Sequence, residues 1–170
     1  ILAQADLTQP SEISSLVSSL SSIDVLVNSA AFMPSGNVDA LSLENWDTAL
    51  DLNLRAPFLL AQTASKIMTE GSSIINISDM GAQKAWSRYP SYTVSKAALE
   101  SLTKILARAL APKIRVNGIA PGFVLQSDIV PAAEWERLIG RVPLKRAART
   151  EEITSTLEFL LKNEYITGQI

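Results

Sequence analysis

The sequence predicts an α/β fold built around a parallel β-sheet, and three observations carry this prediction. Short apolar runs alternate along the chain with longer stretches of helical periodicity. The chain has 170 residues, of which 47% are hydrophobic, enough for a core of its own. No internal repeat, linker or shift in composition divides it. We therefore expect one domain over residues 1–170.

Three apolar runs are predicted to be the buried strands of this sheet. Each holds five or six residues, too few for a helix, and is rich in branched aliphatic side chains. The runs are 24–28, 73–78 and 113–118, and a further strand is expected to begin at 166–170. The segment 120–131 is predicted to be a loop.

The longer stretches have apolar residues at helical spacing. The segment 11–22 contains enough serine to suit a flexible linker, but four apolar residues keep the i, i+3, i+4, i+7 spacing and favour an amphipathic helix. They are Ile13, Leu16, Val17 and Leu20. The other predicted helices are 43–68, softly interrupted near Asn53, then 92–110, 132–139 and 151–161.

The predicted helix 92–110 is apolar over more than half of its circumference, so it is expected to be buried on more than one side. One side can face the sheet. The other can be covered by another part of the chain or by a partner subunit. We favour the partner subunit and expect a homo-oligomer, either a dimer or a tetramer.

The composition excludes several kinds of site. The absence of His and Cys excludes a Ser-His-Asp triad, a thiolate nucleophile and His- or Cys-ligated metal, so no metal site is expected. Fifteen basic and seventeen acidic residues give a net charge of −2, which offers no reason to expect nucleic acid or an anionic membrane as partner. Because neither a signal peptide nor a run of about 18 apolar residues is present, we expect a cytoplasmic protein acting on a small molecule.

Tyr92 and Lys96 are candidate catalytic residues, because they lie four positions apart on a predicted helix and so share one face. A free phenol has a pKa near about 10, and a neighbouring cation favours its ionised form, which brings a tyrosine towards acid–base use at neutral pH. Taken alone, the pair can also be a coincidence, since many helices carry Tyr and Lys at this spacing.

Six motifs around this pair occur in an order that resembles one known family. They are Asp6-Leu7, Asn28-Ser29-Ala30-Ala31, Asn53 within 51–58, Tyr92 with Lys96, Pro121-Gly122 within 115–122, and Ile166-Thr167-Gly168-Gln169. Over nearly its whole length the chain resembles the short-chain dehydrogenase/reductase family. The resemblance implies a doubly wound, Rossmann-like parallel sheet, of which this chain would cover roughly strand 3 to the start of strand 7, and a nicotinamide dinucleotide cofactor.

The resemblance also implies a role for each matching residue. Tyr92 would give or take a proton, while Lys96 would lower the pKa of Tyr92 and hold the nicotinamide ribose. Asn53 would carry a water that links Lys96 to solvent. The residues implied at the cofactor are Asp6, Leu7, Asn28, Ala30, Tyr92, Lys96, Pro121, Gly122 and Val124.

One position departs from the family pattern. Thirteen residues before the tyrosine, where the family has serine, this chain has Asp79. Ser78 precedes it, but neighbouring strand residues point to opposite faces, so Ser78 would need a kink or a one-residue shift to replace it. Aspartate at this position resembles the pteridine and dihydromonapterin reductases, in which Asp and Tyr together protonate a pterin C=N. We therefore expect Asp79 to be catalytic with Asn53, Tyr92 and Lys96.

Aromatic residues near the pair leave alternatives open. Tyr89 lies seven residues before Lys96, the spacing of divergent enoyl reductases, but Tyr92 has both the family spacing and the expected offset from the aspartate. Trp86 or Phe123 can stack on a flat substrate ring, or can pack as part of the core or of a lid.

The expected domain is incomplete at both ends. The family's strand order 3-2-1-4-5-6-7 would place two strands and the Gly-rich phosphate turn upstream of residue 1, and a short tail downstream. The segments that discriminate NAD from NADP belong to that upstream part. NADP is therefore favoured by the resemblance to pteridine reductases alone, and NAD stays an alternative.

Three functions are carried forward. The first is an NADP-dependent reductase of a pterin-type C=N. The second is a reductase of the same family that acts on a carbonyl, as in a 3-oxoacyl thioester or a sugar. The third is a binding or scaffold protein that has lost catalysis, against which the retention of Tyr92, Lys96 and Asn53 argues.

Overall fold

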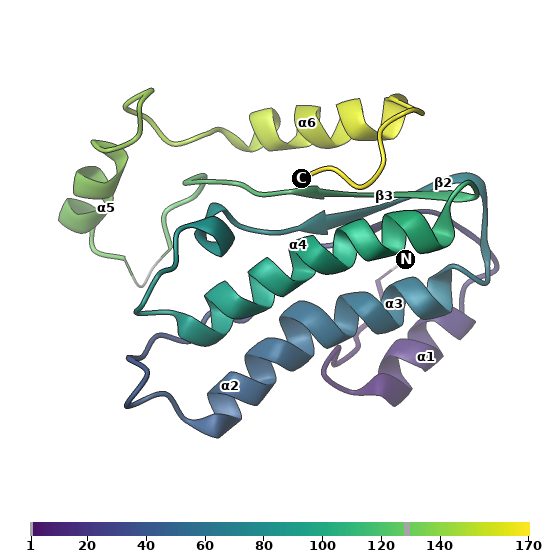
Figure 1. The fold of residues 1–170 in the computed structure, drawn as a ribbon, viewed down its shortest axis with the longest axis horizontal. Coiled ribbons are helices and arrows are strands. Elements are labelled where there is room, and N and C mark those ends of the chain that lie inside the picture. The colour runs from purple at the N-terminus through teal and green to yellow at the C-terminus, as the bar shows by residue number, and fades with distance from the viewer. Residues whose placement is uncertain (1, 128–129) are drawn as a thin grey trace.

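The computed structural model describes residues 2–127 and 130–170, and it contains a parallel three-stranded sheet (Figure 1). The strands are β1 (Ile23–Asn28), β2 (Met68–Ile77) and β3 (Ile114–Ile119), in the spatial order β1-β2-β3. The predicted α/β class and parallel sheet are thereby confirmed. β2 begins five residues before the predicted run, since Met68 already pairs with Ile23 of β1.

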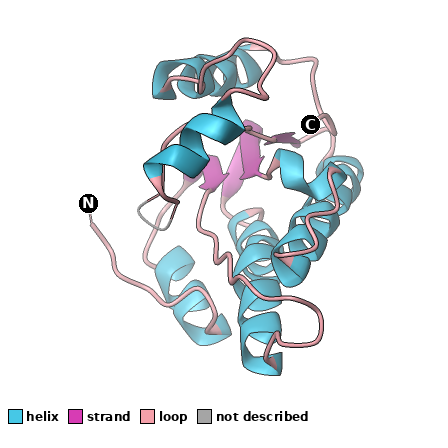
Figure 2. Ribbon diagram, turned by 90° about the vertical axis from the view of Figure 1, so that its left-hand side faces the viewer, coloured by secondary structure: helices cyan, strands magenta, loops and turns pink. Residues whose placement is uncertain are grey.

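Helices cover both faces of the sheet (Figure 2). On one face lie α1 (Pro10–Ser18), α3 (Ala56–Ala64) and α4 (Pro90–Leu110), and on the other lies α6 (Thr150–Lys162). α5 (Ala132–Ile139) has the predicted bounds and stands at one end of the sheet. The arrangement is that of a doubly wound sheet, and it follows from parallel strands that are joined by helical crossovers.

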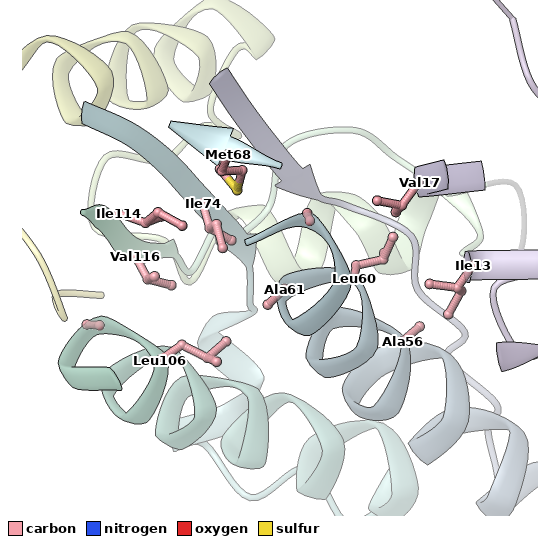
Figure 3. Packing of buried hydrophobic residues seen from close by; sticks show 12 residues of the cluster. Ile13, Val17, Ala56, Leu60, Ala61, Met68, Ile74, Leu106, Ile114 and Val116 are labelled. Atoms are coloured by element: carbon pink, nitrogen blue, oxygen red, sulfur yellow. The ribbon is translucent and has the colours of Figure 1, made fainter. Parts of the chain in front are cut away.

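The sheet separates two clusters of buried hydrophobic residues, because successive residues of β2 point to opposite faces. Ile74 packs with α1, α3 and α4, where Leu60 and Leu106 close the larger cluster (Figure 3). Ile75 points the other way and packs on Leu160 of α6. This burial on both faces explains why the strand sequence is continuously apolar rather than alternating.

The predicted interruption near Asn53 is present and has a defined form. α2 (Leu43–Leu50) runs into one turn of π-helix, Asp51–Arg55, before α3 begins. Such a π-turn rotates the following residues relative to a regular helix, and it is frequent at functional sites. The helical stretch ends at Ala64, earlier than predicted, because Met68 already belongs to β2.

Two expected strand segments are not strands in the structure. Residues 2–9 form no strand, and Asp6 instead begins the turn that leads into α1. Residues 166–170 are not assigned as a strand, yet they run beside β3: Gly168 N donates to Val116 O at 2.7 Å, and Gly118 N donates to Gln169 O at 2.8 Å. α1 also ends at Ser18, before the predicted limit at 22.

Some apolar surface stays exposed. On β1, Val25 and Val27 are 42% and 41% exposed on the face opposite α3. The expectation of further strands beyond β1 stays a prediction. The predicted loop 120–131 is irregular over 120–127, whereas 128–129 lie outside the described residues. Within the described part of the chain, no helix combines the length and apolarity needed to cross a membrane.

Candidate active site

The candidate catalytic residues meet where β2 ends and α4 begins. Asp79 follows β2 by two residues, and Tyr92 lies in the first turn of α4, which Pro90 opens at a position that needs no N–H donor. The side chains are therefore brought together by the crossover from β2 to α4. This end of a parallel sheet, outside the carboxyl ends of the strands, is where α/β folds bind ligands.

Asp79 is hydrogen-bonded directly to Tyr92. The Tyr92 hydroxyl donates to Asp79 Oδ2 at 2.9 Å, and Gly81 N donates to the other oxygen, Oδ1, at 2.6 Å. Asp79 is also the N-cap of the short 3₁₀ turn η2 (Met80–Gln83). A Cβ at position 81 would lie 2.8 Å from the Trp86 ring and 3.0 Å from Asp79 Oδ1, so only glycine leaves room for this arrangement.

Lys96 lies under the same tyrosine. Its Nζ is 5.7 Å from the centre of the Tyr92 ring and donates to Ile77 O at 2.7 Å. Lys96 is 2% exposed, and this burial lowers its pKa to about 8, although the Asp79 carboxylate acts in the opposite direction. The ammonium is thus only partly retained at mildly alkaline pH.

The expected lowering of the Tyr92 pKa by Lys96 is not found. Burial raises the pKa of Tyr92 above its ordinary value, and the charge and hydrogen bond of Asp79 raise it further. The physical reason is that a carboxylate accepting from the hydroxyl stabilises the protonated phenol, whereas the Lys96 ammonium is directed to a backbone carbonyl.

Ser78 does not take the position of the family's serine. Its hydroxyl donates to Glu100 Oε1 at 3.1 Å and to Lys96 O at 3.4 Å, away from the Tyr92 hydroxyl. The strand end is therefore not shifted by one residue. Tyr89, the alternative tyrosine, packs edge-on against Trp86 with ring centres 6.4 Å apart.

Sequence reasoning missed Glu100, which braces the segment around Asp79. Its two carboxylate oxygens accept from Ser78 on one side of Asp79 and from Gln83 Nε2, at 3.4 Å, on the other. The sequence could have pointed to Glu100, because it lies four residues after Lys96 and therefore on the same face of the helix. The chain is thereby hydrogen-bonded to Glu100 of α4 both before the η2 turn, at Ser78, and at its last residue, Gln83.

Asn53 organises the backbone opposite Tyr92. Its Oδ1 accepts from Phe32 N at 2.8 Å, and its Nδ2 donates to Phe32 O and to Ser95 Oγ, each at 2.9 Å. Ser95 Oγ in turn donates to Tyr92 O. Asn53 is completely buried, and both of its amide hydrogens have protein acceptors. The water that Asn53 is expected to carry stays a prediction.

Three of the residues expected at the cofactor line one cavity at the end of β1. Leu7, Asn28 and Ala30 border this space of about 290 Å³, whose other walls are mainly apolar. Asn28 Nδ2 donates to Asn76 Oδ1 at 2.8 Å, whereas Asn28 Oδ1 is buried with no partner among the described residues. A buried acceptor beside an apolar cavity fits a ligand that brings a hydrogen-bond donor on a flat ring, as adenine does.

Asp6 stands apart from this cavity. Its carboxylate accepts from Thr8 Oγ1 at 2.7 Å and from Thr8 N at 2.9 Å, and these bonds lower its pKa. The side chain lies at the surface and serves the turn before α1. Its predicted contact with the cofactor stays a prediction.

The Pro121-Gly122 segment lies against Met80, the residue that follows Asp79. Met80 N donates to Pro121 O at 3.1 Å, and a Cβ at Gly122 would lie 3.2 Å from Met80 Sδ. Val124 follows in the same loop and is half-buried. Phe123 packs edge-on against Trp135 of α5, with ring centres 5.6 Å apart.

Comparison with known proteins gives a consistent result. The chain matches the family described as enoyl-(acyl carrier protein) reductase over residues 1–170. It is 33% identical to a 3-oxoacyl-[acyl-carrier-protein] reductase of Synechocystis, over 99% of this chain and 72% of that protein. It is 39% identical to glucose and ribitol dehydrogenase homolog 2 of Arabidopsis thaliana, over 91% of this chain and 56% of that protein.

Among solved structures, FolM alternative dihydrofolate reductase 1 from Brucella canis, complexed with NADP, superposes with a TM-score of 0.93. It is 36% identical and covers 99% of this chain and 69% of that one. The chain belongs to the short-chain dehydrogenase/reductase family. As a member of this family of oxidoreductases it has, between the end of β2 and the start of α4, an aspartate where the family pattern has serine.

Proposed function

We propose that this short-chain dehydrogenase/reductase is an NADP-dependent reductase of a pterin-type C=N. The observation that carries the proposal is the 2.9 Å hydrogen bond from the Tyr92 hydroxyl to Asp79 Oδ2. A serine in place of Asp79 would suit a carbonyl substrate, because its hydroxyl donates a hydrogen bond to the carbonyl oxygen. An ionised carboxylate is an acceptor, and it suits a heterocycle that presents N–H groups.

The proposed division of labour uses four side chains. Tyr92 holds the proton that is given to the substrate nitrogen, because its raised pKa keeps it protonated. Asp79 accepts from the ring N–H groups and orients Tyr92, and Gly81 N fixes the carboxylate from behind. Lys96 supplies positive charge beneath the tyrosine, and Asn53 fixes the backbone that faces it.

The cofactor fits the residues at the strand ends. Leu7, Asn28 and Ala30 would hold the adenosine part, while Lys96 with the Pro121-Gly122 segment would hold the nicotinamide part. When bound, the nicotinamide supplies the hydride. NADP is preferred because the Brucella canis structure is a complex with NADP. A reductase that uses this cofactor suits the cytoplasm, which we propose as its location.

A carbonyl reductase is the second candidate function. It is favoured by the names of two relatives, the 3-oxoacyl-[acyl-carrier-protein] reductase of Synechocystis and the glucose and ribitol dehydrogenase homolog of Arabidopsis. A non-catalytic scaffold is disfavoured, since such a protein has no use for a buried Lys96 under Tyr92. Failure of the full-length protein to bind either nicotinamide nucleotide would support the scaffold.

The test is a substrate panel with the full-length protein and both nucleotides. Oxidation of NADPH by 7,8-dihydrobiopterin should exceed its oxidation by an acetoacetyl thioester or by a sugar-derived ketone. Turnover of the thioester alone would replace the proposal with the second candidate.

We also propose that a second copy of the chain covers the outer side of α3 and α4. Val94 and Ile105 are 47% and 60% exposed and lie on one side of α4, and Phe58 is exposed on neighbouring α3. Apolar side chains grouped on adjacent helices are typical of subunit contacts.

A further inference from the structure

A second cavity begins beside Asp79. It has a volume of about 620 Å³ and lies between η2, the loop after β3 and the segment that follows α5. Gly122 borders it together with Met80, the residue directly after Asp79. Met80 and Gly122 thus join the cavity to the segments next to Asp79, although Asp79 and Tyr92 are not among its lining residues. Its apolar lining residues are Met80, Phe123, Leu138, Val142, Pro143 and Leu144.

The charges in this cavity do not cancel. Lys84, Arg141, Arg146 and Glu152 line it. Arg146 donates to both oxygens of Glu152, at 2.7 and 2.6 Å, and holds the pKa of Glu152 at about 2, so these two charges neutralise each other at any working pH. Lys84 and Arg141 remain, and neither forms an ion pair among the residues that the structure describes.

Acidic groups on the neighbouring segments, among them Glu100 beside Lys84, already have hydrogen-bond partners. Glu134 of α5 is bound by Arg137, and Arg141 reaches it only at longer range, where its charge contributes to lowering the Glu134 pKa. Glu151 is bound by the Thr150 hydroxyl. The cavity therefore keeps an excess of positive charge.

This local charge contrasts with the rest of the chain, whose net charge is −2. The segment 141–149 holds four cations and no acidic residue. Lys84 closes the η2 turn through its backbone N–H, which donates to Gly81 O, but its side chain and that of Arg141 are both exposed at the cavity. Two uncompensated cations above apolar walls are typical of a site for an anionic group carried on an apolar linker.

The geometry points to the substrate's tail. Lys84 follows Asp79 by five residues, at the end of the η2 turn, and lines the cavity together with Met80. We infer that the cavity binds an oxyanion, either a carboxylate or a phosphate, at the end of an extended tail whose other end reacts at Asp79 and Tyr92. This inference rests on the proposed reductase function.

Two sources supply this chemistry. On a pterin, the tail is the p-aminobenzoylglutamate of dihydrofolate, with its carboxylates beyond an aromatic linker. On an acyl thioester, it is pantetheine with its phosphate. In both cases the apolar walls cover the linker, and Lys84 and Arg141 donate charge-assisted hydrogen bonds to the oxyanion.

The experiment compares substrates that differ only in the tail. The full-length protein and its Lys84→Ala, Arg141→Ala and double variants are assayed with dihydrofolate against 7,8-dihydrobiopterin, and with acetoacetyl coenzyme A against acetoacetyl-N-acetylcysteamine. Lys66→Ala is the control, because Lys66 is an exposed cation beyond the far end of α3. Each cavity substitution should raise KM for the anionic substrate about tenfold and leave kcat and the tail-free substrate unchanged.

The outcomes separate this inference from the proposed function. A rise in KM for dihydrofolate alone assigns the carboxylate source, and a rise for acetoacetyl coenzyme A alone assigns the phosphate source while overturning the pterin proposal. Equal effects on anionic and tail-free substrates, or none, overturn the inference. If neither pair is turned over, calorimetric binding of dihydrofolate and of coenzyme A to the same variants decides, and binding insensitive to both cations overturns it.

Discussion

At the scale of single residues, the site is set by the carboxylate of Asp79. One of its oxygens accepts a hydrogen bond from Gly81 N and the other accepts one from the Tyr92 hydroxyl. The sequence could identify Asp79, since the spacing of thirteen residues before the tyrosine survives in the chain. It could not give the sign of the Tyr92 pKa shift, because burial and the direction of the Lys96 ammonium depend on packing.

The pKa of Lys96 predicts a pH dependence. Burial lowers it to about 8, so the side chain is charged below that pH and neutral above it. If the charge assists Tyr92, kcat/KM should fall as the pH rises through about 8, while the raised pKa of Tyr92 keeps the phenol protonated. A pH–rate profile from 6 to about 10 checks this. In Lys96→Arg the fall should move to higher pH, because arginine keeps its charge; an unmoved fall would assign it to another group.

Gly81 is predicted to tolerate no side chain. In Gly81→Ala the new Cβ would meet the Trp86 ring at 2.8 Å and displace the amide that holds Asp79. The free energy of unfolding should fall by about 1–3 kcal/mol, and turnover should fall with it. The matched control is Gly36→Ala, whose Cβ would have its nearest neighbour at an ordinary 3.5 Å. Equal behaviour of the two variants in thermal unfolding and turnover would contradict this account.

At the scale of elements, the π-turn between α2 and α3 is the best example of what a pattern can and cannot predict. The interruption near Asn53 was readable because the apolar spacing of 43–68 loses its phase there. The bonds from Asn53 to Phe32 and Ser95 were not readable, since they join segments 21 and 42 residues away. For the same reason, the start of β2 at Met68 required knowledge of its partner β1.

Replacing Asn53 tests how much its hydrogen bonds contribute to the stability of the fold. Asn53→Ala would leave the backbone N–H and C=O of Phe32 and the Ser95 hydroxyl without these partners in a buried region. We expect the free energy of unfolding to fall by at least about 2 kcal/mol, as measured by denaturant titration. Asn37→Ala, at an exposed loop position, is the control and should have little effect. A loss of activity with unchanged stability would instead support a purely catalytic role.

At the scale of the whole molecule, the sheet separates two differently covered layers. The larger core lies between the sheet and α1, α3 and α4, and the smaller one lies under α6. Periodicity predicted the helices and strands that build these layers, but which helix covers which face depends on the packing and was not predicted. The apolar residues that continue around α4 predicted a second cover for this helix; in the structure Val94 and Ile105 are exposed, and their cover by a partner subunit stays a prediction.

That exposed side predicts an association. Ile105→Glu places a charge in the middle of the apolar surface on α3 and α4, so an oligomer held by this surface should dissociate to a smaller species. Light scattering coupled to size-exclusion chromatography measures the mass. Val38→Glu is the control, because Val38 is 82% exposed in the loop before α2 and outside that surface. An oligomer of unchanged mass in Ile105→Glu would place the interface elsewhere.

The central claim is that Asp79 and Tyr92 act together on a pterin-type C=N. The most direct measurement is kcat/KM of Asp79→Ser with 7,8-dihydrobiopterin and with an acetoacetyl thioester, in the full-length protein. Our account predicts that the pterin value falls by about a hundredfold or more, because the acceptor for the ring N–H groups and for Tyr92 is lost, while the thioester value is kept or raised. A pterin value that stays the same or rises in Asp79→Ser would contradict it.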